Sequence, residues 1–223
     1  MIVAKEKLFK DRINKTNEIS LAKELIRAME EGGDALTEFL LGTTQPESYS
    51  ANGTYREGDH QRCGGLNGNS FSEKRLCKCL YYKNGTYCDS EECQKCDFPE
   101  EYRRSVIGDY FITDYEVPAF YHGDGIGEID MVISDGRTQY ATEVKPPRGN
   151  KETLLRMIAE IMTYTIGYPA GKYERAIAFF EGTSQAEEFD NPAPEIKELL
   201  EKCGIAAFCF KEADGEAYQI CRL

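Results

Sequence analysis

The sequence contains no run of 18 apolar residues, so we expect no membrane-spanning helix. Its first seven residues, Met-Ile-Val-Ala-Lys-Glu-Lys, lack the apolar core of a signal peptide. These two absences predict an intracellular, cytoplasmic protein. In that compartment the nine cysteines are expected to be thiols or metal ligands rather than a disulfide framework.

The sequence also lacks an excess of basic residues. Its 27 Lys and Arg face 39 Asp and Glu, which gives a formal net charge of −12. This balance argues against a protein that coats nucleic acid through a basic surface. A nucleic-acid enzyme is not excluded, because charge is uneven: residues 145–175 carry six Lys or Arg against three acids.

Tryptophan is absent, but 14 Tyr and 11 Phe supply large side chains for a core. A chain of 223 residues suffices for one domain that carries an insert. Residues 42–75 are rich in Gly, Asn, Ser, Thr and Arg without periodicity, which is typical of a loop or extended insert. We therefore predict N-terminal helices over 1–42, a cysteine-rich insert over 43–104 and a core domain over 105–223.

Hydrophobic patterning predicts a mixed β-sheet flanked by helices, an α/β (α+β) fold. Helical spacing of apolar residues predicts helices at 18–31, 35–41, 151–167 and 194–203. Aromatic and β-branched residues predict strands at 106–121 (one bent strand or two), 127–133, 141–145, 175–180, 205–210 and 217–221. Asp34 is expected to cap the second helix.

The first predicted helix carries acids at Glu24 and Glu31, which we expect on a solvated face. An acid on such a helix would reach a metal only if the helix packed beside the strands.

Six of the nine cysteines lie within 34 residues, from Cys63 to Cys96. A C-x-C pair and a C-x2-C pair bracket Asn84-Gly85, which predicts a hairpin between two Tyr-bearing segments. Two close thiolate pairs suit tetrahedral zinc, so we predict a zinc ribbon. The expected ligands are Cys77, Cys79, Cys93 and Cys96, with Cys63, Cys88 and His60 as substitutes. An iron–sulfur cluster fits the same residues, and free or bridged cysteines without metal are a further alternative. Three later cysteines fall in apolar segments and are expected to be buried thiols, namely Cys203, Cys209 and Cys221.

Two predicted strands, 127–133 and 141–145, carry the chemistry of interest. Residues two apart on a strand project from the same face, so Glu143 and Lys145 point together while Val144 points into the core. Paired as a hairpin, these strands bring Asp130 to the same place. Two acids and a lysine on one face are poor core residues. They suit a hard divalent cation held beside a water, although a cross-strand salt bridge on a solvated sheet face is the alternative.

At these positions the chain resembles the PD-(D/E)xK nuclease superfamily, most closely its RecB-type branch. Residues 127–130 (Gly-Glu-Ile-Asp) are similar to the Gly-x-Ile-Asp strand of that branch, and residues 143–145 (Glu-Val-Lys) to the (D/E)-x-K strand. The next helix carries Glu160 and Tyr164, which resemble the Gln-x-x-x-Tyr motif with Glu in place of Gln. The resemblance covers roughly residues 105–182 and can extend to the helix at 18–31. It implies a restriction-endonuclease-like fold and metal-dependent hydrolysis of DNA in phage, defence or repair processes.

The resemblance and the residues together assign expected roles. Asp130 and Glu143, with the Val144 carbonyl, are expected to bind Mg²⁺ or Mn²⁺, and Lys145 to orient the attacking water. Glu160 and Tyr164 are the remaining expected catalytic residues. Other expected contributors are Glu116 and Glu128 as auxiliary ligands, His122 as a second base or a surface turn residue, and Arg148, Lys151 and Arg156 as phosphate contacts.

Two other functions remain open. One is a non-catalytic module that binds nucleic acid or protein on a nuclease-like scaffold, with the cysteine insert making the contacts. The other is an iron–sulfur nuclease. The expected partner is DNA, with assembly as a homodimer or within a larger nucleic-acid-processing complex.

Overall fold

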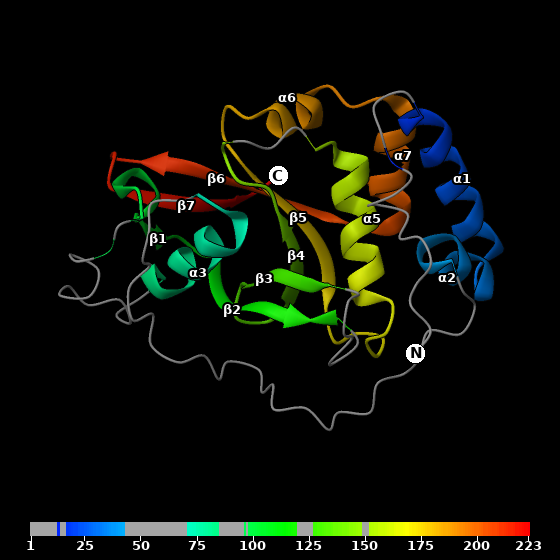
Figure 1. Cartoon of the computed structure of the whole chain (residues 1–223), viewed down its shortest axis with the longest axis horizontal. Coiled ribbons are helices and arrows are strands. Elements are labelled where there is room, and N and C mark those ends of the chain that lie inside the picture. The colour runs from blue at the N-terminus through cyan, green and yellow to red at the C-terminus, as the bar shows by residue number, and fades with distance from the viewer. Residues whose placement is uncertain are drawn as a thin grey trace.

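The computed structural model describes residues 13, 17–42, 71–84, 96, 98–119, 127–148 and 152–223. They build a seven-stranded mixed sheet with helices on both faces, which confirms the predicted mixed sheet flanked by helices (Figure 1). The strands are β1 (Ser105–Ile107), β2 (Phe111–Pro118), β3 (Glu128–Ser134), β4 (Gln139–Val144), β5 (Glu174–Phe180), β6 (Ala206–Ala213) and β7 (Ala217–Arg222). The helices are α1 (Glu18–Glu31), α2 (Asp34–Leu41), α3 (Glu73–Lys83), η2 (Glu100–Tyr102, a 3₁₀ helix), α5 (Leu154–Thr165), α6 (Ser184–Asp190) and α7 (Pro194–Cys203).

The strands lie in the order β1-β7-β6-β5-β4-β3-β2. β3 and β4 form the predicted antiparallel hairpin, while β4, β5 and β6 run parallel to one another. The segment expected as one bent strand or two is two strands at opposite edges of the sheet. β2 pairs with β3, and β1 pairs with β7. Gly108, with φ +111°, lies where the chain leaves β1, a conformation that glycine adopts without steric cost.

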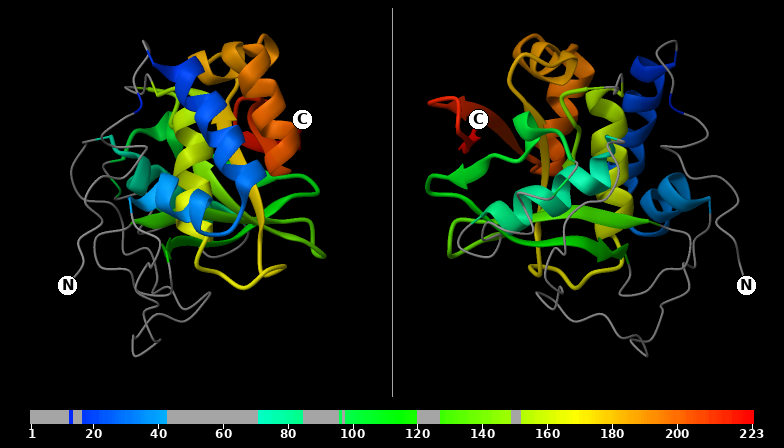
Figure 2. Two further views of the ribbon diagram at one scale, coloured as in Figure 1. Left: turned by 90° about the vertical axis from the view of Figure 1, so that its right-hand side faces the viewer. Right: turned by 60° about the vertical axis from the view of Figure 1, so that its left-hand side comes forward.

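One face of the sheet is covered by α5, which is buried along its whole length except at Arg156. A helix that is apolar all round needs cover on both sides. The sheet covers α5 on one side, and α2 and α7 pack against it from the other, with α1 beside α7 (Figure 2). None of the helices in the described part of the chain is long and apolar enough to cross a lipid bilayer.

The helix α1 has the predicted bounds and buries Leu21 and Leu25. Glu24 is exposed and Glu31 pairs with Arg27, so the solvated-face interpretation of these acids is confirmed. The cap prediction at Asp34 was wrong. Asp34 is the first residue of α2, and Gly33 occupies the N-cap position.

The opposite face of the sheet is covered by α3, a helix that the sequence analysis did not predict. A loop followed by a Tyr-bearing extended segment was expected here. The prediction of an extended segment before Asn84 was wrong, because these residues are helical. Ser72 caps the helix by accepting a hydrogen bond from the Arg75 N–H at 3.3 Å. Leu76 and Leu80, one turn apart and fully buried, then fix the helix against the sheet.

Cys77 and Cys79 both lie on α3 and are buried, and Cys96 is half-buried. The other proposed ligands of the insert fall outside the described residues, namely His60, Cys63, Cys88 and Cys93. In the ranges that the structure describes, no cysteine cluster of three or more forms a metal-binding group. The zinc and iron–sulfur alternatives therefore remain predictions.

We predict that Leu80→Ala destabilises the chain by about 2–5 kcal/mol, because it leaves a cavity between α3 and the sheet. Urea unfolding measures the loss. Ile107→Ala is the control: the side chain is 46% exposed on an edge strand, so its effect should stay within about 0.5 kcal/mol. Equal losses in the two variants would show that α3 does not depend on this contact.

Candidate metal centre

The site forms where the β3–β4 hairpin opens. The ladder between the two strands ends at Met131 and Thr142. Beyond this point the Val144 N–H donates a hydrogen bond to Asp130 Oδ2 at 2.8 Å, so a side chain replaces a strand partner. Val144 is fully buried, while Glu143 and Lys145 meet in an ion pair. This arrangement confirms the alternation predicted for residues 143–145.

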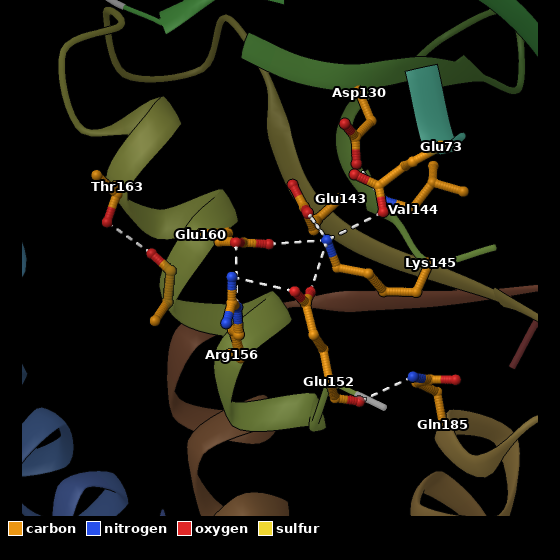
Figure 3. A network of polar contacts seen from close by, with 11 residues as sticks. Glu73, Asp130, Glu143, Val144, Lys145, Glu152, Arg156, Glu160, Thr163 and Gln185 are labelled. Atoms are coloured by element: carbon orange, nitrogen blue, oxygen red, sulfur yellow. Dashed lines mark hydrogen bonds and ion pairs between the residues drawn. The ribbon is translucent and has the colours of Figure 1, made fainter. Parts of the chain in front are cut away.

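Three carboxylates from three elements converge here. Glu73 from α3, Asp130 from β3 and Glu143 from β4 each offer one oxygen, and these oxygens lie within 4.8 Å of one another (Figure 3). Glu143 Oε2 is buried and has no hydrogen-bond partner in the described part of the chain. Hard oxygen donors that converge in this way fit a Mg²⁺ or Mn²⁺ ion.

Glu73 was not among the predicted site residues. The helical acids considered from the sequence lie in α1, whereas α3 supplies the third carboxylate. The available signal was Ser72 as a helix cap, followed by Leu76 and Leu80 at one-turn spacing. That pattern marks a helix start whose first turn contains Glu73.

Lys145 lies at the centre of the acidic cluster, with its side chain only 4% exposed. Its Nζ is 2.9 Å from Glu160, 3.0 Å from Glu152 and 3.3 Å from Glu73, and it also pairs with Glu143 (Figure 3). Burial disfavours the charged ammonium, but the surrounding carboxylates, Glu143 foremost, outweigh burial and raise the pKa of Lys145. Glu160, one of the expected catalytic residues, thus lies beside Lys145 in the structure.

Glu152 is the second residue that the sequence analysis missed. It precedes α5, and its backbone carbonyl accepts a hydrogen bond from Gln185 Nε2 of α6 at 2.8 Å. Its carboxylate also pairs with Arg156 at 3.0 Å. A buried glutamine and an arginine one helical turn away therefore hold Glu152 beside Lys145 (Figure 3). No motif pointed to this acid, because its partners come together only in the tertiary structure.

The acids resist being charged together. Burial raises the pKa of Asp130, and repulsion by Glu73 adds to the effect. Burial also raises the pKa of Glu143, with Asp130 as the main repelling neighbour. For Glu160 burial acts in the same direction, but a hydrogen bond with Glu143 and the charge of Lys145 lower its pKa. A divalent cation would relieve this repulsion, which is a second reason that the residues fit one.

Formal charge supports the same conclusion. Two cations, Lys145 and Arg156, face five carboxylates, so the cluster carries a formal charge of −3 when all are ionised. The five carboxylates are those of Glu73, Asp130, Glu143, Glu152 and Glu160. A bound dication would bring the cluster close to neutrality.

Tyr164 borders the site on α5 and is buried. Gly127, at the start of β3, has φ +139°, and a Cβ built on it would lie 2.4 Å from Tyr164 Cε1. Tyr164 can therefore pack against the backbone of residue 127 only because that residue is glycine. Burial, together with nearby carboxylates led by Glu143, raises the pKa of Tyr164. Tyr164 thus forms part of the wall of the site.

The expected auxiliary acids lie outside the triad. Lys74 pairs with Glu128 at 2.8 Å and with Glu116 at 3.3 Å. Lys74 follows Glu73 directly, so this bridge ties the first turn of α3 to β2 and β3. The ion pairs of Lys74 therefore help to hold the neighbouring Glu73 carboxylate in place.

The expected phosphate contacts divide into three cases. Arg156 pairs with Glu152 at 3.0 Å and Glu160 at 3.4 Å, within the acidic cluster. Arg148 lies instead beside Glu101 at 2.9 Å and over the ring of Tyr102 at 5.5 Å. Lys151 lies outside the described residues, as does His122.

The expected buried thiols are found in part. Cys209 is buried, while Cys203 and Cys221 are half-buried. Cys203 Sγ contacts Met29 Sδ at 3.0 Å and Met162 Sδ at 3.6 Å.

Searches against models of protein families, curated proteins and solved structures each returned no match for this chain. The chemistry of the site is therefore inferred from its own residues.

We predict that Gly127→Ala destabilises the chain by about 1–3 kcal/mol more than Gly136→Ala does. Both glycines have positive φ, but a Cβ at Gly136 meets nothing within 4 Å, so only Gly127→Ala adds a clash with Tyr164. Chemical denaturation gives both values. In a Tyr164→Ala background the excess should shrink, and an unchanged excess would rule out this clash as the cause.

We predict that Asp130→Asn stabilises the metal-free chain at neutral pH. The folded pKa of Asp130 is raised, so folding opposes its ionisation. The destabilisation by this carboxylate is absent below the ordinary Asp pKa of about 3.9 and grows as pH rises towards the folded pKa. Unfolding in chelator at several pH values should show the gain at pH 7 and its disappearance near pH 4.

Asp135→Asn is the matched control. Asp135 is exposed, and hydrogen bonds from the Thr138 and Arg137 N–H groups lower its pKa. Its loss should destabilise at neutral pH, the opposite sign. A destabilising Asp130→Asn would contradict the repulsion inferred here.

Proposed function

We propose that this chain is a metal-dependent deoxyribonuclease of the PD-(D/E)xK type with a restriction-endonuclease-like core. The observation that carries the proposal is the convergence of Glu73, Asp130 and Glu143 within 4.8 Å, with Lys145 paired to Glu143. A solvated cross-strand salt bridge does not account for this arrangement, because Glu143 and Lys145 are 2% and 3% exposed. Burying such charges is costly unless they have partners or bind an ion.

The proposed roles follow from position. Glu73, Asp130 and Glu143, with the Val144 carbonyl, would hold Mg²⁺ or Mn²⁺. The bound ion would activate water and stabilise the charge that develops on the scissile phosphate. The Lys145 ammonium, beside the triad, would donate to the attacking water and to the anionic transition state.

Glu152 and Glu160 would position Lys145 rather than contact the substrate. Both contact the ammonium from the α5 side, where Glu160 also lies beside Glu143 (Figure 3). Arg156 neutralises part of their charge and would contact phosphate at the edge of the site. Tyr164 would close the wall of the site beside β3.

The net charge of −12 requires DNA contacts to be local. Two exposed cations flank the site: Lys74 next to Glu73, with a side chain 60% exposed, and Arg148 beyond Lys145, 69% exposed. The cysteine-rich insert, proposed to bind zinc, would add further contacts. The same net charge also favours the second candidate function, a non-catalytic module on a nuclease-like scaffold.

We predict that the full chain cleaves DNA in Mg²⁺ or Mn²⁺ and stops when chelator is added. Asp130→Ala, Glu143→Ala and Lys145→Ala should each reduce the rate at least about 100-fold, because each removes stabilisation of transition-state charge. Glu73→Gln should do the same. Linear, circular and single-stranded DNA, resolved on gels with time, provide the measurement.

Glu24→Gln is the matched control, since it removes an exposed acid of α1 and should leave cleavage unchanged. Circular dichroism establishes that each variant is folded. Cleavage that survives all three alanine substitutions would refute the nuclease. Calorimetry that finds no divalent-ion binding outside the cysteines would favour the binding module.

A further inference from the structure

Two cysteines that play no part in the acidic site face each other across the β6–β7 ladder. Cys209 is the register partner of Cys221, between the pairs Phe208–Arg222 and Phe210–Ile220. Neither is in a disulfide in this structure. Register partners in an antiparallel ladder project from the same face of the sheet, so the two thiols lie side by side.

The hydrogen-bond pattern fixes the spacing of this pair. The Leu223 N–H donates to the Ala207 carbonyl at 2.9 Å, so these two residues are a hydrogen-bonded pair. Pair types alternate along an antiparallel ladder, which makes Cys209 and Cys221, two positions along, a hydrogen-bonded pair as well. The Cα atoms of such a pair lie about 5.5 Å apart, within the range of roughly 4.4–6.8 Å that a disulfide spans.

The surroundings make the two thiols unequal. Cys209 is 4% exposed in the core between the sheet and α5, and burial raises its pKa to about 11. Cys221 is half-buried. Ala207 and Leu223 form the next residue pair on the same face of the sheet. They line a cavity of about 470 Å³ that also touches Lys197 of α7. Neither cysteine lines this cavity, and the half-buried Cys221 is the more accessible of the two thiols.

We propose that Cys209 and Cys221 form a reversible dithiol–disulfide site that low-molecular-weight disulfides, such as oxidised glutathione, oxidise. The Cys221 thiolate attacks one sulfur of the oxidant, forming a mixed disulfide and displacing one glutathione thiolate. Cys209 then loses its proton and attacks the Cys221 sulfur, which releases the second glutathione. The two protein thiols give up two electrons and two protons, and one glutathione disulfide becomes two glutathione thiols.

The bond would fasten β7 to β6 near the end of β7. That strand also carries β1 on its outer edge. Arg222 of β7 donates to Tyr140 Oη at 3.0 Å and lies over the Tyr140 ring at 5.4 Å, which links β7 to β4. Oxidation would therefore stabilise one edge of the sheet. The proposal is independent of the nuclease, because neither cysteine belongs to the acidic site.

The test uses the folded full chain equilibrated with mixtures of oxidised and reduced glutathione. Peptide mapping by mass spectrometry without reduction should find a Cys209–Cys221 cross-link that disappears with excess reduced glutathione. The map separates this cross-link from any formed by the cysteines between 63 and 96. The oxidised chain should unfold at a higher denaturant concentration than the reduced chain, because the cross-link restricts the unfolded state.

Cys221→Ser should abolish both the cross-link and the redox-dependent stabilisation. Cys203→Ser should leave both intact, since Cys203 lies against Met29 and Met162 instead of a cysteine. The proposal is overturned if Cys221 accumulates only as a glutathione adduct, or if the cross-link forms only under denaturing conditions.

Discussion

The buried ammonium of Lys145 is the constraint around which the rest of the site is arranged. An isolated cation at this depth would be strongly destabilising, because only 3% of Lys145 is exposed to solvent. Carboxylates from α3, β4, the segment that precedes α5, and α5 itself surround it, namely Glu73, Glu143, Glu152 and Glu160. These carboxylates come from helices on both faces of the sheet and from a central strand, so the lysine links the helices to the centre of the sheet.

The fold supplies this meeting point by ending a ladder early. β3 and β4 pair only as far as Met131 and Thr142. Beyond that point the Asp130 carboxylate accepts the hydrogen bond from the Val144 N–H, in place of a strand carbonyl. The separated strand ends make room for α3 to bring Glu73 from one face and α5 to bring Glu160 from the other. The end of the β3–β4 ladder, the start of α3 and the Val144–Asp130 hydrogen bond therefore depend on one another.

An element or site residue could be predicted from the sequence where the interactions that fix it are local in the chain. Strand alternation predicted the meeting of Glu143 and Lys145, and helical spacing predicted α1 and α7 to the residue. α3 was missed although Ser72, Leu76 and Leu80 carry a helix signal, because that signal follows directly on a long polar stretch without periodicity. Glu152 was missed because Gln185, 33 residues later, holds it in place. Such long-range contacts leave no periodic signal in the sequence.

The glutamate at position 160 gains a physical role from this arrangement. A neutral glutamine there would leave Lys145 with only Glu152 on the α5 side. With Glu160 present, Lys145 has two anionic partners on that side in addition to Glu73 and Glu143. Under the proposed function, a divalent ion bound at the triad would repel the Lys145 ammonium and compete with it for the carboxylates of Glu73 and Glu143. Glu152 and Glu160 would then retain Lys145 beside the triad, and the excess negative charge would let a divalent ion and the lysine occupy adjacent positions.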